Sequence, residues 1–423
     1  MEGNAPGVAG NDDAFPWSES GHQYQNRLNG ENAVTFDKPL FPVTVVGSLP
    51  RSKEVLQALK RKTRGDITSE EFRYITGKAV LDCLKLQDDA GVEIVSDGEQ
   101  RRDSFFSFVA EHIEGARLMT LADMLEFVED KAAFERLLSA LDVPAFAIKN
   151  PVAVGKLKRK TPLALNDFLY LKQHTDKPIK VTLPGPYLMT RSMWVKALSS
   201  KFYPDKESLG NDIVRILRAE LMDLRDNGCR FVQFDEPVLT EVAFAGPNET
   251  HTFMCAALSE KSSPKEELDF AVELINRVVE GIGPEMKTAL HVCRGNWSQK
   301  ENVLLRGAYD PLIPYFSRMN VNQFVLEYAT DRAGSIEALA GLPANKEIGL
   351  GVVDPRTPEV ETVEFVINKV KTLLKYRKPD QIYLNSDCGF GTFSDRPMNT
   401  PEIAGEKMRV MSKAAKILRS NLK

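Results

Sequence analysis

The chain is poor in cysteine, has no long hydrophobic run and carries little excess charge. Its five cysteines are an odd number, scattered over positions 83, 229, 255, 293 and 388. This spread excludes a disulfide framework and indicates a reducing compartment, so we expect a cytoplasmic protein. No stretch of about 18 apolar residues occurs, which excludes a transmembrane helix. The first residues also lack the basic-then-apolar layout of a signal peptide.

The charges of the chain nearly cancel. There are 55 Lys and Arg residues and 59 Asp and Glu residues, which leaves a formal net charge of −4. Because no basic excess is available to neutralise a phosphate backbone, nucleic acid is not expected as a partner. Hydrophobic residues make up 43% of the chain and charged residues 27%, an ordinary globular balance that predicts a large buried core.

What the sequence does contain is a regular series of short runs rich in β-branched residues. Such runs are typical of buried strands. There are eight of them, at residues 43–47, 92–96, 179–183, 231–235, 288–293, 324–327, 348–353 and 382–386.

The segments between these runs are predicted to be helical. Residues 211–226 carry leucine and isoleucine at helical spacing and are followed by Asn227-Gly228, a helix C-terminal signal. Thr357-Pro358 and Thr400-Pro401 each predict the start of another helix, as N-cap and first residue. Eight strands alternating with helices favour parallel pairing and a single (β/α)8 TIM barrel, with an open doubly wound sheet as the alternative.

Two stretches do not fit the regular alternation. Residues 1–38 are rich in Gly, Asn, Asp and Glu, and we expect a flexible N-terminal extension before a barrel domain at 39–423. The second and third strands are separated by far more residues than a crossover needs, which predicts an α/β insertion at about 116–178. Within it, the pattern predicts a helix over 119–142 and a small hairpin over 145–155.

The strongest chemical signal is His291-Val292-Cys293 at the end of the fifth run. On a strand, residues two apart share a face, so both side chains could bind one ion. Glu327 and Cys388 follow the sixth and eighth runs. Taken alone, Cys388 could be an ordinary small residue and Glu327 a salt-bridge partner. As a set, the four side chains predict a zinc site at a barrel mouth.

The charge of this ligand set indicates a reaction. Two thiolates and a carboxylate around Zn²⁺ leave the site near −1, which makes the ion a weak activator of water. Such an ion still holds a substrate thiol as thiolate, so the residues favour alkyl transfer to sulfur over hydrolysis.

Acidic residues follow two other runs. Asp97-Gly98-Glu99 comes after the second, Asp235-Glu236-Pro237 after the fourth, and Ser48 follows the first. The carboxylates of Glu99 and Asp235 could bind an amino group or act as acid and base. Either acidic pair could instead cap the helix that follows it.

In their order along the chain, these residues resemble the C-terminal catalytic barrel of cobalamin-independent methionine synthase. The resemblance covers roughly residues 40–420 and rests on Gly47-Ser48, Asp97-Gly98-Glu99, Asp235-Glu236-Pro237, His291-x-Cys293, Glu327 and Asp387-Cys388-Gly389. It implies zinc ligands at His291, Cys293, Glu327 and Cys388. It also implies that homocysteine is held by Ser48 at its carboxylate and by Glu99 and Asp235 at its amino group, and that the product is methionine.

The chain departs from the family in two ways. It is too short for the family's second, N-terminal barrel, and Asp354-Pro355-Arg356 stands where the family has Asp-x-His. Arginine does not serve as a general acid near neutral pH. The methyl donor is therefore expected to be either methyl-folate or a methylated corrinoid. Arg356 would suit an anionic group on a corrinoid partner or would simply be a surface residue at a helix start.

Three other functions remain open. A zinc-dependent enzyme could alkylate a different thiol, for example by opening an epoxide with coenzyme M. A non-catalytic protein could use zinc only to staple the barrel. A porphyrinogen-decarboxylase barrel is the third, disfavoured because that lineage lacks the metal set.

Overall fold

A computed structural model describes residues 38–127, 131, 148–244, 263–300, 303–394 and 397–422. Apart from Lys38, the predicted N-terminal extension lies outside these residues, and so does Cys255.

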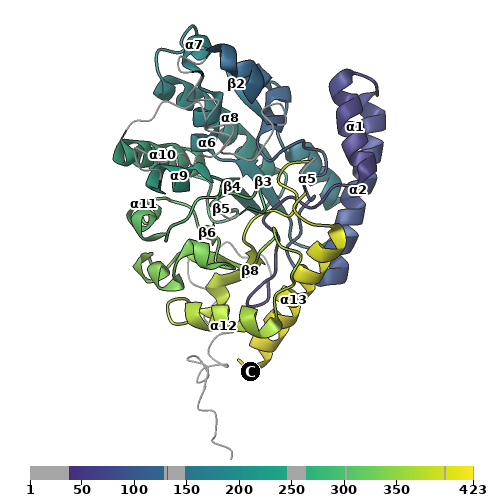
Figure 1. The fold of residues 1–423 in the computed structure, drawn as a ribbon, viewed down its shortest axis with the longest axis vertical. Coiled ribbons are helices and arrows are strands. Elements are labelled where there is room, and N and C mark those ends of the chain that lie inside the picture. Colours follow the sequence, from purple (N-terminus) through teal and green to yellow (C-terminus); the bar gives the residue numbers. More distant parts are fainter. Residues whose placement is uncertain are drawn as a thin grey trace, which may run out of the picture.

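The centre of the molecule is a parallel sheet of six strands, around which the helices are arranged (Figure 1). Its order follows the sequence, β3-β4-β5-β6-β7-β8. These strands are β3 (Lys180–Pro184), β4 (Phe231–Asp235), β5 (Lys287–Val292), β6 (Gln323–Leu326), β7 (Glu347–Val353) and β8 (Ile382–Ser386). Six of the eight predicted strands are thereby found within one or two residues of their expected bounds.

The two remaining predicted strands close the sheet into a ring. They form single parallel bridges, Val43 with Leu384 of β8, Thr44 with Ile94, and Val95 with Ile179 beside β3. Backbone hydrogen bonds support this closure, because Thr44 N–H donates to Leu384 O and Lys180 N–H donates to Val95 O. Eight parallel segments therefore surround one axis. The predicted (β/α)8 barrel is confirmed, and the open sheet is excluded.

Helices follow most of the barrel strands and pack on the outside of the ring. They are α1 (Lys53–Arg64), α2 (Ser69–Ala90), α5 (Leu165–Lys172), α6 (Pro186–Met193), α7 (Lys196–Ser199), α8 (Lys206–Asp226), α9 (Val238–Phe244), α10 (Pro264–Val279), α11 (Ile313–Phe316), α12 (Val363–Leu373) and α13 (Pro401–Ser420). The last helix, α13, packs between α2 and α12, so the end of the chain returns to its first helical pair (Figure 1).

Two of the predicted helix starts and ends are correct, and one start is wrong. Helix α8 ends at Asp226 with Asn227 as its C-cap, and α13 begins at Pro401 with the Thr400 side chain accepting from Ile403 N–H. Helix α12 begins at Val363, not at Thr357-Pro358. The Thr362 side chain caps it, while Asn399 donates to the backbone carbonyl of Thr357 and holds that residue in the preceding loop.

The insertion after the second barrel segment is built differently from the prediction. Its hairpin pairs β1 (Ile113–Thr120) antiparallel with β2 (Lys149–Arg159), so the first strand starts well before the predicted hairpin. Of the predicted helix over 119–142, the structure describes α3 at Leu121–Met124, and most of the remainder lies outside the described residues. Thr120 forms a capping box with Asp123, which starts this helix directly after β1. Strand β2 packs on α6, α7 and α8 and so joins the insertion to the barrel wall.

Apolar side chains fill the barrel interior and the space between strands and helices. The inner group takes one residue from each of six barrel segments: Val46, Ile94, Phe231, Ala289, Val325 and Tyr383. This is the layered filling expected of a packed (β/α)8 core. Chemistry is therefore confined to the two ends of the barrel.

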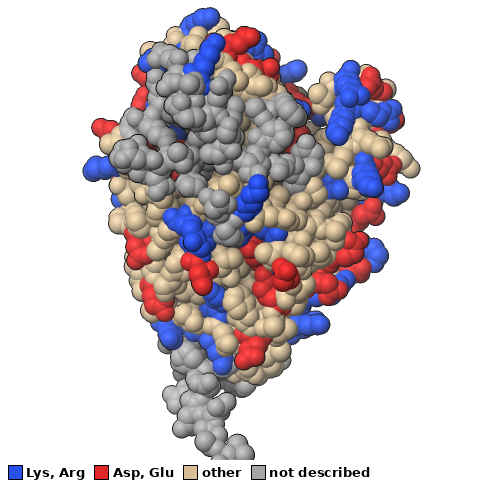
Figure 2. All heavy atoms as spheres, in the orientation of Figure 1, with Lys and Arg blue, Asp and Glu red and all other residues tan. Residues whose placement is uncertain are grey.

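The described surface agrees with the composition. On the face drawn in Figure 2, Lys and Arg side chains lie interspersed with Asp and Glu side chains. Among the helices that the structure describes, none has both the length and the apolar character needed to cross a membrane.

Candidate active site and metal centre

The predicted site residues lie at the carboxyl ends of the barrel segments, as the sequence pattern predicts. Six of them line one pocket with an empty volume of about 530 Å³: Ser48, Glu99, Asp235, His291, Cys293 and Cys388. Neighbouring parallel strands end on the same side of the ring, which explains why residues from five different segments converge. The seventh predicted residue, Glu327, does not line this pocket.

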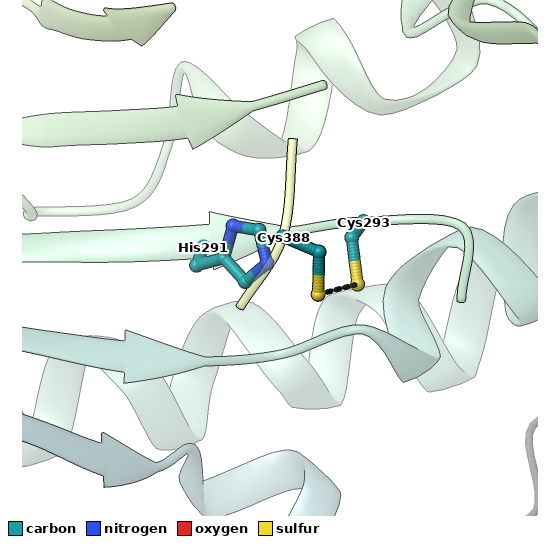
Figure 3. Close-up of side chains that lie close together, drawn as sticks. All are labelled: His291, Cys293 and Cys388. Atoms are coloured by element: carbon teal, nitrogen blue, oxygen red, sulfur yellow. Dashed lines mark hydrogen bonds between the residues drawn. The ribbon is translucent and has the colours of Figure 1, made fainter. Parts of the chain in front are cut away.

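Three side chains in the pocket form a compact metal-binding group. The ligand atoms of His291, Cys293 and Cys388 all lie within 4.8 Å of one another. Figure 3 shows the two sulfur atoms side by side and the imidazole ring of His291 next to Cys388. The two sulfurs are 4.0 Å apart, and both cysteines are free thiols. An ion bound between them would have one imidazole and two thiolate ligands, a set typical of zinc.

The orientation of His291 suits metal binding. Its Nδ1 faces the backbone carbonyl of Val325 at 3.2 Å, so Nδ1 carries the proton and donates it. The other ring nitrogen, Nε2, is buried and has no hydrogen-bond partner within the described part of the chain. A fixed tautomer with an unpartnered Nε2 is the arrangement that metal-ligating histidines adopt.

The two thiols differ in their acidity. The pKa of Cys388 is lowered to about 5, first by its hydrogen bond with Cys293 and also by His291, while burial opposes the change. The same interaction and burial raise the pKa of Cys293. One thiolate is thus favoured near neutral pH even before an ion binds, and a cation would ionise the second.

Glu327 is held by two arginines. Its carboxylate oxygens lie 3.4 Å from Arg294 Nη1 and 3.2 Å from Arg332 Nη2, and all three residues are buried. Tyr309 Oη accepts a hydrogen bond from the Glu327 backbone N–H. The structure therefore pairs the predicted fourth ligand with cations and leaves its carboxylate outside the three-residue group.

Glu99 sits in a strained turn at the pocket. Its φ of 54° lies in the left-handed region, which non-glycine residues seldom adopt and which is often found at functional sites. Thr182 Oγ1 donates to Glu99 Oε1 at 2.8 Å, whereas Oε2 is buried without a hydrogen-bond partner among the described residues. Burial raises the pKa of this carboxyl, although Arg102 and Arg51 oppose the change. The unpartnered oxygen is suited to a donor from a ligand.

Asp235, the last residue of β4, faces the same pocket. Gln233 Nε2 donates to its Oδ1 at 2.9 Å. Burial raises the pKa of Asp235 to about 7, and the neighbouring Glu99 adds to the shift while His291 opposes it. Glu99 has Arg102 as a buried counter-charge, with Arg102 Nη1 3.8 Å from Glu99 Oε1, whereas Asp235 forms no ion pair within the described residues. A cationic ligand in the pocket would therefore stabilise the charged form of Asp235.

Ser48 lies close to the loop that carries Cys388. Its Oγ accepts a hydrogen bond from Gly391 N–H at 3.3 Å, and Gly389 packs so tightly on it that a side chain there would overlap the Ser48 hydroxyl. The hydroxyl therefore stands at the edge of the pocket, between the acidic residues and the metal-binding group.

Sequence reasoning missed part of the pocket wall. The missed residues include three aromatic rings and two polar groups: Phe105, Trp297, Phe393, Asn296 and Thr392. Asn296 donates to the Gly389 carbonyl and to Thr392 Oγ1, which ties the loop after β5 to the loop after β8. Its position three residues after Cys293 was the only available signal.

Arg356 is buried and paired within its own loop. Its Nη2 lies 2.9 Å from Asp354 Oδ2, and its backbone N–H donates to Asp354 Oδ1. The reading of Arg356 as an exposed residue at a helix start is therefore wrong. The short pair forms because the turn at Pro355 folds the arginine back over the aspartate.

Comparisons with known proteins identify the family of the chain. A family model described as "Cobalamin-independent synthase, Catalytic domain" matches residues 41–417. Relatives named methionine synthase from Pyrococcus abyssi and Pyrococcus furiosus are each 31% identical to this chain, and each match covers 91% of this chain and 94% of the relative. The chain therefore has nearly the same extent as these relatives.

Solved structures share the fold. A B12-independent methionine synthase from Shewanella sp. W3-18-1, in complex with selenomethionine, superposes with a TM-score of 0.69 at 23% identity, covering 91% of this chain and 99% of that one. A methyltransferase from Methanosarcina mazei gives 0.53 at 13% identity, covering 90% and 95%. The predicted family and the predicted methyltransferase class are both confirmed, and the chain belongs to the catalytic-domain family of the cobalamin-independent synthases.

Proposed function

We propose that the protein is a zinc-dependent methyltransferase that converts homocysteine to methionine. The observation that carries the proposal is the convergence of His291, Cys293 and Cys388 with Glu99 and Asp235 in one pocket. The names of the Pyrococcus relatives support the same product. The metal-binding group would bind the thiol of an amino-acid substrate, and the neighbouring carboxyl groups would bind its ammonium group.

The metal is proposed to be zinc, held by His291, Cys293 and Cys388, with Glu327 as the fourth ligand. Bound zinc would keep the substrate sulfur ionised near neutral pH and reactive toward a methyl group. The fit rests on the unpartnered Nε2 of His291 and on the thiolate favoured at Cys388. The arginines beside Glu327 make its assignment the part of the proposal that needs its own test.

The other pocket residues are proposed to orient the substrate. Glu99 and Asp235 would accept hydrogen bonds from the ammonium group, and Ser48 would donate to the carboxylate. Burial of all three removes water from these contacts and strengthens them. The aromatic rings of Phe105, Trp297 and Phe393 give the rest of the pocket an apolar wall. These residues would therefore hold the substrate thiol in line with the methyl group.

The acidic residues argue against the other thiol reaction. Coenzyme M ends in a sulfonate, and the Glu99 and Asp235 carboxyl groups would repel that anion. A zinc ion that merely staples the barrel is also disfavoured, because the three metal-binding residues border a pocket and the barrel has an extensive apolar core.

The methyl donor is proposed to be methyl-folate or a methylated corrinoid. The Asp354–Arg356 pair is consistent with either donor, since Arg356 is already neutralised within its loop. A cytoplasmic location is proposed from the free thiols of Cys83, Cys229, Cys293 and Cys388.

A donor and acceptor panel tests the function. Purified protein loaded with zinc is given homocysteine or coenzyme M, each with methyl-folate of short or long glutamate tail, methylcobalamin or an epoxide. Methionine formed from homocysteine and one methyl donor is the expected result. Failure of homocysteine with every methyl donor, in protein shown to contain zinc, would overturn the proposal.

A further inference from the structure

A buried lysine lies below the acidic part of the pocket. Lys180, the first residue of β3, is 1% exposed, and its Nζ donates to Gln233 Oε1 at 2.8 Å. Gln233 Nε2 then donates to Asp235 Oδ1 at 2.9 Å and to the Val46 carbonyl at 3.0 Å. A chain of hydrogen bonds therefore runs from Lys180 through Gln233 to Asp235.

Lys180 determines which way the side-chain amide of Gln233 is turned in this chain of hydrogen bonds. A lysine side chain can donate hydrogen bonds to the amide, and in its ammonium form it has no acceptor. The carbonyl oxygen of Gln233 must then face Lys180, which turns the amide nitrogen up toward Asp235. Asp235 Oδ1 is thereby fixed as an acceptor, and Oδ2 accepts no hydrogen bond from the residues described. Lys180 holds the oxygen of this amide, and the Val46 carbonyl helps to hold its nitrogen. Removal of Lys180 would leave the Gln233 oxygen without this donor and loosen the amide that faces Asp235.

Lys180 is surrounded by carboxyl groups and by an aromatic ring. The carboxyl groups that influence it most are those of Asp235 and Glu99. Asp97, Asp167 and Arg102 line a smaller cavity on its other side, and the Phe231 ring lies 5.7 Å from Nζ. Burial lowers the pKa of Lys180 to about 7, so the structure keeps a costly group where an apolar side chain would pack.

A second buried lysine provides a natural comparison. Lys287, the first residue of β5, occupies the same layer, since Phe231 pairs with both lysines across the sheet. Lys287 donates instead to Glu347 and contacts the Tyr383 hydroxyl, at the opposite end of the barrel from the pocket. Both lysines are buried in the same layer of the barrel, but Lys180 donates to Gln233 and Lys287 donates to Glu347.

We propose that Lys180 is a positioning residue for the amino group of the substrate, acting through Gln233 to present Asp235 as an acceptor. The inference rests on the proposed function and deepens it. It assigns recognition of the substrate's ammonium to a three-residue chain that starts beneath the pocket.

The test compares two thiols that differ only in the amino group. Homocysteine and 4-mercaptobutyrate are titrated into zinc-loaded wild-type protein and into the variants Lys180→Met, Gln233→Glu and Lys287→Met. Lys180→Met should weaken homocysteine binding about tenfold, equal to about 1.4 kcal/mol, and change 4-mercaptobutyrate binding less than about twofold. With a competent methyl donor, KM for homocysteine should rise while kcat stays within a few-fold of wild type.

The two further variants separate positioning from folding. Gln233→Glu keeps an acceptor for Lys180 but removes the donor to Asp235, so it should weaken homocysteine selectively even if Lys180→Met folds poorly. Lys287→Met should leave the preference between the two thiols unchanged. Equal losses for both thiols, or no loss in either pocket variant, would overturn the inference. A wild-type protein that does not prefer homocysteine would instead count against the proposed substrate.

Discussion

The sulfur atoms of Cys293 and Cys388 lie 4.0 Å apart, although 95 positions separate the residues in the sequence. One follows β5 and the other follows β8, which are not neighbours in the sheet. The closed ring brings the carboxyl ends of these strands to a common mouth, where His291 completes the group. The proposed chemistry depends on this meeting, and the first prediction tests it.

Replacing Cys388 with serine should remove the metal without unfolding the barrel. Serine keeps the side-chain volume but is a poor zinc ligand, and the extensive core does not depend on this residue. We expect zinc content near zero by metal analysis, an unchanged circular dichroism spectrum and no methyl transfer. Cys229→Ala is the matched control, since Cys229 is buried two residues before β4, does not line the pocket and should not affect zinc content. Joint loss of zinc and folded structure in Cys388→Ser would favour a stapling role.

Replacing Glu327 with glutamine should lower both stability and zinc affinity. Two buried arginines would lose their counter-charge, and breaking a buried ion pair costs about 3–5 kcal/mol. Urea unfolding of metal-free protein measures the first effect. A competition titration with a chelator measures the second. Unchanged zinc affinity in Glu327→Gln would show that Glu327 is not a ligand and that it serves only to pair the arginines.

Lys180 should give the stability of the fold a measurable pH dependence. Its pKa is about 7 in the folded protein, lowered by burial from 10.5. Between pH 7 and 10.5 the unfolded chain therefore binds more protons at this site, and stability from this group rises with pH in that window. Below pH 7 the amine is protonated in both states, and the contribution is constant. The slope cannot exceed about 1.4 kcal/mol per pH unit.

The difference between wild type and Lys180→Met isolates that slope above about pH 8, because groups away from Lys180 titrate alike in both proteins and Asp235, with a pKa of about 7, is by then mostly ionised. In denaturant unfolding at several pH values, the free energy of unfolding of wild type should rise relative to that of the variant between about pH 8 and 10. A difference that stays flat over this range would contradict the assigned environment of Lys180.

Adding a methyl group at Gly47 should impair the substrate site alone. A Cβ there would overlap Glu99 Oε1 and approach Thr182 Cγ2 to 3.0 Å, so the Glu99 carboxylate would have to move. Overpacking of this kind costs about 1–3 kcal/mol. We expect Gly47→Ala to raise KM for homocysteine and to keep wild-type zinc. Gly405→Ala is the control. A Cβ at this position would approach Leu86 Cδ1, the end of a flexible side chain, to 3.0 Å, so KM should be unchanged. Loss of zinc in Gly47→Ala would show that the change reaches beyond Glu99.

The sequence by itself determined the barrel and six of the residues that line the pocket. The apolar runs located β3 to β8 and the two bridged segments before them. Polar residues at the carboxyl ends of the first, second and fourth runs marked Ser48, Glu99 and Asp235. This works because the carboxyl end of every parallel strand is assigned to the same side of the ring by the chain's direction. The insertion was predicted less well, since its pairing of β1 with β2 depends on packing against α6 to α8 and not on local pattern.

Only the tertiary structure decided which side chains face one another. Glu327 follows its strand as the pattern predicts, yet Arg294 and Arg332 hold its carboxylate. Arg356 is buried against Asp354, and Lys180 reaches Asp235 through Gln233. The period of a strand determines which face a residue lies on, but partners are chosen by distances across the barrel and by the cost of burying a charge alone. The distances across the barrel and the burial of each charge are set only when the ring closes, so the sequence pattern alone does not determine them.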